Sequence, residues 1–281
     1  MPTLQSALDY AVQRLISASE SPLLDAEILL CLTLDIDRSY LRAWPEKNLS
    51  PEQNSHFVAL LQKRLSGVPI AYITGRREFW SRDFEVNRDV LIPRPDTELL
   101  IELALQRIPE RQSYRLIDLG TGSGIIAITL AAERPNSEVI ATDCSTGALT
   151  LARRNAHKHN VRNIQFVQSD WFEAISESVQ FNLVVCNPPY IADNDPHLTE
   201  GDVRFEPLSA LIADNHGLSD IERIAADARR HLPTQGHLLI EHGYNQQNQV
   251  QAIFSQLDYH NIVTYRDLSG QPRVTYGQWR P

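Results

Sequence analysis

The sequence contains little cysteine. Its 281 residues include three cysteines, Cys31, Cys144 and Cys186. An odd number of widely spaced cysteines predicts neither a disulfide framework nor a zinc site. We therefore expect reduced thiols, no bound metal and a cytoplasmic protein.

Long apolar runs and low-complexity tracts are also missing. No segment stays apolar over the roughly 18 residues that a membrane-spanning helix needs, and no signal peptide is visible at the N-terminus. With 42% hydrophobic and 22% charged residues, the composition supports a sizeable globular core. We expect no membrane attachment.

Positive charge is in short supply. Lys and Arg number 26 against 35 Asp and Glu, which gives a formal net charge of −9. Proteins that bind DNA neutralise its phosphates with Lys and Arg. The bulk charge therefore argues against duplex DNA or an anionic membrane as the partner, and we expect no direct nucleic-acid readout.

The N-terminal quarter of the chain has helical periodicity. Apolar residues recur at helical spacing from Leu4 to Ile16. Ser21-Pro22 and Ser50-Pro51 open two further helices, and Gly67 stops the last of them. This pattern therefore predicts a small helical bundle at residues 1–75.

Residues 76–92 change to an alternating aromatic pattern. The stretch "REFWSRDFEV" predicts a β-hairpin, which we interpret as a linker containing the domain border. Pro93 and Pro95 follow, and Asp96 stands where it could cap the next helix. A second domain is then expected at 93–281.

From Tyr114 onward, strands and helices alternate. Helices are expected, for example, at 145–158 and 217–231. Strands are expected at 114–118, 138–142, 164–168, 181–186, 235–241, 261–266 and 272–279. This alternation predicts an α/β domain with a mostly parallel sheet covered on both faces. The short connection before the final strand makes that strand antiparallel.

A strand, a glycine-rich turn and a helix follow one another in "LIDLGTGSGIIAITLA", residues 116–131. Glycine permits tight turning and lets the backbone approach a ligand. The helix that follows points its N-terminal N–H groups at the same place. The cofactor-binding residues expected in this turn are Gly120, Thr121, Gly122, Ser123 and Gly124.

Polar or aromatic side chains also end the next three strands. Asp143, about 20 residues past the glycines, stands where a ribose diol is usually held. Asp170 could accept from an exocyclic amine, Trp171 could cover a purine face, and Asn187 ends the fourth strand. Open α/β sheets bind ligands at the carboxyl ends of their strands, so these residues predict a nucleoside-binding edge.

Other interpretations of these residues stay open. Asp143 could cap the helix that begins near Ser145, and Asp170 with Trp171 could be a loop cap beside a core aromatic ring. A nicotinamide dehydrogenase would show the wider spacing G-x-G-x-x-G, whereas here Gly124 comes one residue early. The turn suits a nucleoside without a pyrophosphate better.

The fourth strand ends abruptly in "NPPY", residues 187–190. Two prolines donate no backbone hydrogen bonds and cannot continue a central strand. The Asn187 side-chain oxygen and the Pro188 carbonyl could accept the N–H bonds of a substrate nitrogen, and the prolines would keep those carbonyls rigid. A plain proline turn, with Asn as the turn former, is the alternative.

Taken together, "DLGTGSG", Asp143, Asp170 and "NPPY" resemble the class I methyltransferases that use S-adenosylmethionine. "NPPY" marks the subset that acts on planar nitrogens. With "EFW" at 78–80, "LIPRPDTE" at 91–98, "FEP" at 205–207 and "DLSGQPR" at 267–273, nearly the whole chain resembles the bacterial peptide-chain release factor glutamine methyltransferases. One departure is His216-Gly217, where that family usually has Asp-Gly.

The resemblance implies a Rossmann-like domain with a seven-stranded, mostly parallel sheet, a small helical N-terminal domain and a β-hairpin linker. It also implies methyl transfer from S-adenosylmethionine to the glutamine of the Gly-Gly-Gln motif in class I release factors. Residues 1–75 would recognise this protein partner, and we expect a monomer when the chain is free. The catalytic residues would be Asn187, Pro188 and Tyr190, the substrate-binding residues would add Pro189, and Asn187 would also border the cofactor.

The chemistry accounts for such a motif. An amide nitrogen is a poor nucleophile because its lone pair is delocalised into the carbonyl group. Acceptors at Asn187 and Pro188 would orient it and raise its electron density, while Tyr190 packs against the flat amide. No histidine or general base is required. A ribosomal-protein glutamine methyltransferase, a DNA adenine methyltransferase and a cofactor-binding module without catalysis remain as alternatives.

Overall fold

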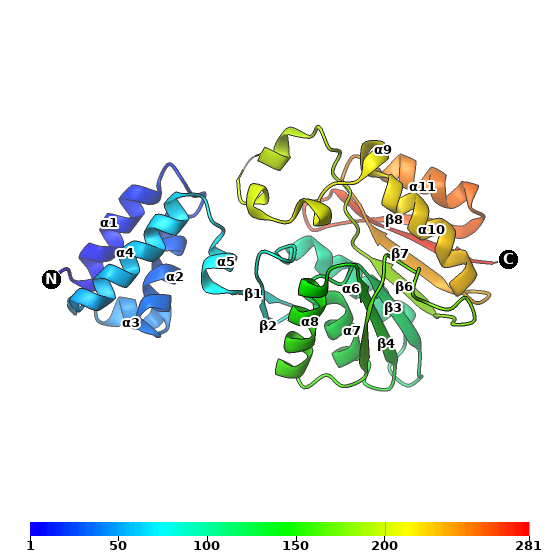
Figure 1. Cartoon of the computed structure of the whole chain (residues 1–281), viewed down its shortest axis with the longest axis horizontal. Helices are drawn as coiled ribbons and strands as arrows, with labels where there is room; N and C mark the ends of the chain where they lie inside the picture. Colours follow the sequence, from blue (N-terminus) through cyan, green and yellow to red (C-terminus); the bar gives the residue numbers. More distant parts are fainter. Residues whose placement is uncertain (200, 281) are drawn as a thin grey trace. The chain divides into compact units, whose positions relative to one another are not determined.

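The computed structural model describes residues 1–199 and 201–280. The chain divides into two compact units, which Figure 1 colours along the sequence. Unit 1 consists of Met1–Gly75 with His197–Phe205, and unit 2 consists of Arg76–Pro196 with Glu206–Pro281. A short internal segment therefore leaves unit 2 after Pro196, joins unit 1, and returns at Glu206.

Unit 1 is helical, as the periodicity predicted. Its helices are α1 (Leu4–Leu15), α2 (Pro22–Leu34), α3 (Arg38–Ala43), α4 (Pro51–Leu65) and α5 (Ile70–Thr74). Pro22 and Pro51 stand in the first turns of α2 and α4, where a missing N–H costs little. The buried core lies between α1, α2 and α4 and includes Ala11, Leu29 and Leu61. The short helices α3 and α5 contain too few periodic residues to be predicted.

Arg64 of α4 ties the internal segment to the helices of unit 1. Its Nε donates to Asp25 Oδ2 at 2.7 Å, and its Nη1 donates to Asp202 Oδ1 at 2.9 Å. Gly67 follows with φ +93°, and a Cβ there would lie 3.0 Å from the Phe205 ring. The segment is therefore held by a buried charge and by close packing at the end of α4.

Unit 2 begins with a hairpin of β1 (Arg76–Phe79) and β2 (Arg82–Glu85), which confirms the predicted hairpin. Trp80 and Ser81 form its turn with φ +52° and +55°. Two-residue hairpin turns need this left-handed conformation, which residues other than glycine rarely adopt. The Trp80 N–H donates to Glu98 Oε1 at 3.1 Å, and its indole N–H donates to Glu133 Oε1 at 3.3 Å. These bonds hold the turn in place.

The sheet of unit 2 has the strand order β5-β4-β3-β6-β7-β9-β8. Its strands are β3 (Arg115–Leu119), β4 (Glu138–Asp143), β5 (Ile164–Gln168), β6 (Leu183–Cys186), β7 (His237–Glu241), β8 (Tyr259–Arg266) and β9 (Pro272–Trp279). The pairs from β5 to β7 are parallel, and β9 is antiparallel to both β7 and β8. The predicted mostly parallel sheet with an antiparallel final strand is confirmed.

Helices cover both faces of this sheet (Figure 1). One face packs against α6 (Glu98–Arg107), α7 (Ile125–Glu133) and α8 (Thr146–Lys158). The other packs against α10 (Ser219–His231) and α11 (Gln247–Gln256). Val185 and Leu239 lie in the first core, and Val184 and Leu238 lie in the second. Strands buried on both faces explain the continuous apolar runs in the sequence.

One local prediction is wrong, and one predicted helix starts two residues late. Asp96 does not cap the following helix: it lies inside the 3₁₀ turn Pro95–Thr97, and α6 begins after Thr97. Its Oδ2 instead meets Arg273 Nη2 at 3.2 Å, so an ion pair replaces the cap. The helix expected at 217–231 begins at Ser219, because α9 (Asp214–Gly217) is a separate turn with left-handed residues at Asn215 and His216.

Candidate active site

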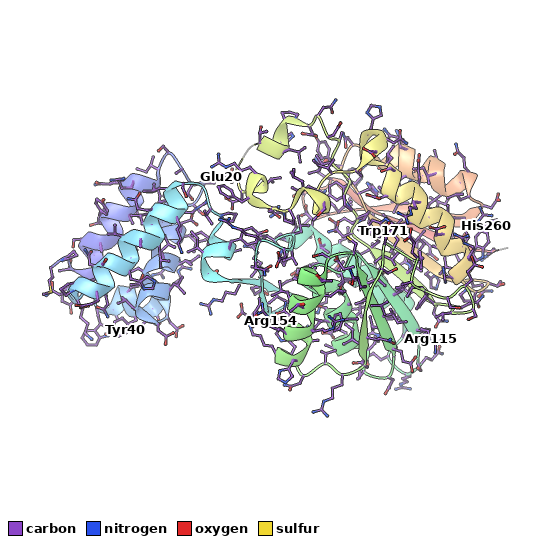
Figure 2. All side chains as sticks on the ribbon, viewed as in Figure 1. Glu20, Tyr40, Arg115, Arg154, Trp171 and His260 are labelled. Carbon is purple, nitrogen blue, oxygen red and sulfur yellow. The ribbon has the colours of Figure 1, made fainter. Side chains whose placement is uncertain are left out.

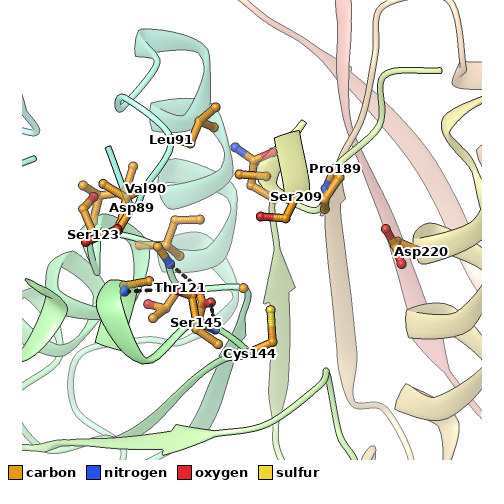
Figure 3. A pocket seen from close by; sticks show the side chains of 18 of the residues that line it. Asp89, Val90, Leu91, Thr121, Ser123, Cys144, Ser145, Pro189, Ser209 and Asp220 are labelled. Atoms are coloured by element: carbon orange, nitrogen blue, oxygen red, sulfur yellow. Dashed lines mark hydrogen bonds between the residues drawn. The ribbon is translucent and has the colours of Figure 1, made fainter. Parts of the chain in front are cut away.

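The carboxyl ends of the central strands in unit 2 surround a cavity of about 320 Å³. Figure 3 shows Thr121, Ser145, Pro189 and Ser209 around it. The structure brings most of the predicted site residues together here. Those on the lining are Gly120, Thr121, Gly122, Ser123, Asp143, Asp170, Trp171, Asn187 and Pro189. Gly124, Pro188 and Tyr190 are not among the lining residues.

The glycine turn follows β3 directly. Gly120 has φ +70°, and a Cβ there would lie 3.2 Å from the Trp171 ring, so glycine allows a close approach. Gly124, at φ +87°, is the N-cap of α7, and its Cβ would lie 2.7 Å from Ile128 Cδ1. Gly120 therefore shapes the cavity, whereas Gly124 lets α7 start close to its neighbours.

Asp118 supports the turn from inside the sheet. Its Oδ2 accepts hydrogen bonds from the Thr121 hydroxyl at 2.7 Å and from the Ala127 N–H at 3.2 Å. Its Oδ1 has no hydrogen-bond partner within the described part of the chain. Burial raises the pKa of Asp118 to about 7, against the lowering effect of the two hydrogen bonds.

Asp143 joins β4 to the turn. Its Oδ2 accepts from the Gly122 N–H and its Oδ1 from the Ser145 N–H, both at 2.9 Å. Burial raises the pKa of Asp143. The cap of α8 is Ser145, whose hydroxyl accepts from the Ala148 N–H. Asp143 is thus no helix cap, and its carboxyl group lies on the cavity wall.

Asp170 and Trp171 follow β5 and line the cavity, and Figure 2 labels Trp171. Trp171 has φ +48°, a strained value for an aromatic residue. Arg223 of α10 donates to Asp170 Oδ2 at 2.9 Å, and Asp220 forms a hydrogen bond with Trp171. Sequence patterns did not point to Asp220 and Arg223, because they sit on the polar side of an ordinary amphipathic helix.

Asn187 ends β6 on the same face of the sheet as Glu241 of the neighbouring β7. Its Nδ2 donates to the Thr97 hydroxyl at 3.3 Å. The Thr97 hydroxyl acts as a donor toward Glu241 and lowers its pKa, so it is left to accept from Asn187. Among the residues that the structure describes, none donates a hydrogen bond to Asn187 Oδ1, and Asn187 lines the cavity.

Glu241 is a buried acid that the sequence analysis missed. The hydroxyls of Thr97 and Tyr190 lower its pKa, but burial dominates and raises it to about 7. Its Oε2 makes no hydrogen bond to any residue that the structure describes. Burial also raises the pKa of Tyr190. Tyr190 therefore contacts a buried acid rather than the cavity.

The motif segments "LIPRPDTE" and "FEP" meet in the structure. Glu206 Oε2 accepts from the Ile92 N–H at 3.0 Å, and its Oε1 pairs with Arg94. Leu91, Pro93 and Arg94 all line the cavity. Glu206 and Ile92 are 114 residues apart, and no pattern in the sequence predicted this contact.

Two further findings hold for residues 1–199 and 201–280. Within those residues no group of three or more His, Cys, Asp and Glu side chains could hold a metal ion. Over the same residues, no helix is both long and apolar enough to cross a bilayer.

The fold and two family models define the class. The PrmC N-terminal domain matches residues 6–75, and the methyltransferase small domain matches residues 96–201. A methyltransferase from Pyrococcus furiosus aligns with TM-score 0.55 at 16% identity, covering 78% of this chain and 98% of that one. The T. Thermophilus 16S rRNA N2 G1207 methyltransferase aligns with TM-score 0.54 at 16% identity, covering 73% and 50%. The chain has the fold of an S-adenosylmethionine-dependent methyltransferase.

Curated relatives identify the family. The release factor glutamine methyltransferase of Aliivibrio fischeri is 48% identical over 279 residues, covering 99% of this chain and 98% of its own. That of Escherichia coli is 48% identical over 275 residues, covering 98% of each chain. The chain belongs to the release factor glutamine methyltransferase family, which confirms the resemblance found in the motifs. Its cofactor is S-adenosylmethionine.

Proposed function

We propose that this chain transfers a methyl group from S-adenosylmethionine to the side-chain amide nitrogen of the glutamine in the Gly-Gly-Gln motif of class I peptide-chain release factors. Asn187 carries the proposal. Its Nδ2 is engaged by Thr97, so its Oδ1 is the atom available at the cavity wall. A primary amide offers two N–H donors, which is the chemistry that such an acceptor binds.

The cavity residues fit the cofactor. Gly120 has no side chain between the turn and Trp171, and Asp143 presents a carboxyl group beside the same turn. We place the adenosine part of S-adenosylmethionine against Gly120–Gly124, Asp143 and Asp170-Trp171. When bound, S-adenosylmethionine supplies an electrophilic methyl group on a sulfonium.

The protein's own residues prepare the substrate nitrogen. We assign Asn187 Oδ1 and the Pro188 carbonyl as acceptors for its two N–H bonds. They orient the nitrogen and stabilise the positive charge that develops on it. Alignment of this kind contributes on the order of 7–11 kcal/mol in favourable cases. Pro188 and Tyr190 are not among the lining residues, whereas Pro189 is. We therefore limit the role of Pro188 to its carbonyl oxygen and assign Tyr190 to shaping the loop from behind.

The two glycines of the Gly-Gly-Gln motif would help the substrate to enter the cavity. A backbone without side chains enters a narrow cleft easily. We assign recognition of the folded partner to residues 1–75, which contain no catalytic constellation of their own. A cytoplasmic location and a monomeric free state remain predictions.

The test is transfer of a labelled methyl group by the wild type and by Asn187→Ala and Asn187→Asp. A release factor, ribosomal proteins and DNA are the candidate acceptors. Asn187→Ala should lower turnover on the release factor by roughly 100-fold or more, because one preorganised acceptor is lost. Cofactor affinity should change much less, since the loss lies in the transition state.

Asn182→Ala is the matched control. Asn182 precedes β6, and its side chain bonds to the Arg115 N–H at 2.9 Å, away from the cavity. This variant should keep its turnover. If wild type labels ribosomal protein or DNA and leaves release factors unlabelled, the proposed substrate is wrong. If Asn187→Ala stays within a few-fold of wild type, Asn187 has no part in the mechanism.

A further inference from the structure

The Asn187–Tyr190 loop has little backbone support of its own. Pro188 and Pro189 have no N–H to donate. Among the described residues, no group from Pro188 to Tyr190 takes part in a backbone–backbone hydrogen bond. Backbone bonds resume at Ile191, whose N–H donates to Leu211 O at 2.9 Å and whose carbonyl accepts from the Ala213 N–H at 3.0 Å. The loop must therefore be positioned by side chains.

A buried glutamine supplies one of these side chains. Gln246 stands just before α11 and is 5% exposed. Its Nε2 donates to the Tyr190 carbonyl at 3.0 Å, with the carbonyls of His216 and Gly217 at 3.2 and 3.4 Å. Its Oε1 accepts from the Gly243 N–H at 2.8 Å. Both ends of this amide are thus engaged, and its NH₂ group faces three carbonyl oxygens.

Gly217 packs closely against the Tyr190 carbonyl oxygen. Gly217 has φ +81°, and a Cβ at this position would lie 2.1 Å from the Tyr190 oxygen. Asn215 and His216 before it also have positive φ, so the backbone curls tightly around the Gln246 amide. Tyr190, His216 and Gly217 are therefore held at one point by a single side chain.

We propose that Gln246 is a positioning residue for methyl transfer: its amide holds the Tyr190 carbonyl and so places the acceptor groups of Asn187 and Pro188. This inference rests on the proposed function of that loop. Two consecutive prolines fix φ at both positions. A displacement of the Tyr190 backbone therefore also displaces the Pro188 carbonyl. Thr97 holds the Asn187 end of the loop, and Gln246 holds the Tyr190 end.

The test compares Gln246→Met, Gln246→Glu and Gln246→Asn with wild type. Met keeps the size and loses the donor, whereas Glu places a carboxylate against three carbonyl oxygens. Asn keeps an amide but is one methylene too short to bridge Gly243 and Tyr190. Each should lower kcat for a Gly-Gly-Gln peptide by about 10- to 100-fold, as misplacement by about 1 Å does. S-adenosylmethionine affinity should stay within about threefold, because the glycine turn and Asp143 are untouched.

Gln251→Met is the matched control. Gln251 lies on α11, and its Nε2 donates to Thr264 Oγ1 at 2.9 Å rather than to a group of the loop. This variant should keep kcat. Thermal unfolding and cofactor titration accompany every assay, because a merely structural glutamine would lower stability, cofactor binding and kcat together.

The possible outcomes distinguish failure of the proposed function from failure of the proposed role of Gln246. A wild type that leaves the glutamine unmethylated defeats the proposed function itself. An active wild type with Gln246 variants that keep kcat within twofold overturns the role of Gln246. Parallel loss of cofactor binding and kcat in all three variants also overturns it, in favour of general packing. Loss of kcat with folded, cofactor-binding variants supports it.

Discussion

Burial of Asp118 disfavours the charged form of its carboxyl group. Asp118 is fully buried, and only one of its carboxyl oxygens is hydrogen bonded within the described residues. Burial raises its pKa to about 7, whereas the pKa of an unfolded Asp is about 4. Between these values the folded chain keeps a proton that the unfolded chain releases. The stability that this provides is complete below about pH 4 and is lost as pH rises through about 7.

Asp118→Asn should remove this titration. We expect the free energy of unfolding of wild type, relative to the variant, to fall between pH 4 and pH 7 by up to about 1.4 kcal/mol per pH unit. Urea unfolding of both proteins across this range measures it. Asp9→Asn, at an exposed acid of α1, is the control for replacing an acid by its amide at a surface position. A difference between wild type and Asp118→Asn that does not change with pH contradicts the assignment.

At the scale of elements, the start of α7 shows how tightly the glycine turn is packed. Gly124 caps this helix with a left-handed backbone, and Ile128 and Ala152 close over the place where a Cβ would stand. Gly270, in the turn before β9, has a similar φ of +80°, but no atom lies within 4 Å of its Cβ position. Both backbone conformations would therefore strain a residue that has a Cβ, but only the Gly124 position also lacks room for one.

Replacement of each by Ala should separate the two effects. Gly270→Ala should cost about 1–2 kcal/mol, the price of a left-handed Ala. Gly124→Ala should cost a further 1–3 kcal/mol or so, because the added methyl overpacks α7 against α8. Chemical denaturation measures both losses. Equal losses for the two variants would mean that the neighbours of Gly124 move aside freely.

The sequence predicted the ends of helices correctly where a local rule sets them. The prediction failed where a tertiary contact sets the end of the helix. Ser50 and Pro51 begin α4 as expected, since the cap and the proline act within one turn. Asp96 has the right type for a cap, yet it pairs with Arg273, which no local pattern foretells. The helix expected from Gly217 begins two residues later, because the chain first curls around Gln246.

At the scale of the whole molecule, the chain crosses between its units more than once. The segment His197–Phe205 belongs to unit 1, although the chain on either side of it belongs to unit 2. Arg64 and Asp202 anchor it there. Unit 1 therefore does more than precede the catalytic unit along the sequence, since it also holds part of the chain that follows "NPPY".

Removal of residues 1–75 tests the role of unit 1 in partner recognition. The fragment 76–281 should still bind S-adenosylmethionine and methylate a short Gly-Gly-Gln peptide, because the described cavity residues all lie in unit 2. Its kcat/KM on an intact release factor should drop at least tenfold. The ratio of peptide to whole-factor methylation is the measurement. A fragment that modifies the whole factor at the full rate would remove unit 1 from recognition.

The sequence alone determined the alternating strands and helices, the glycine turn after the first strand, and the polar or aromatic residues at the ends of the next three strands. Each of these depends on side-chain period, glycine or proline within a few residues. Only the tertiary structure decided which distant groups support them. Thr97 holds Asn187 across 90 residues, Gln246 holds Tyr190 across 56, and Glu206 reaches Ile92 across 114. Such contacts form when the packed sheet brings separate segments together. The sequence around a buried Thr or Gln does not indicate which distant residue it will contact.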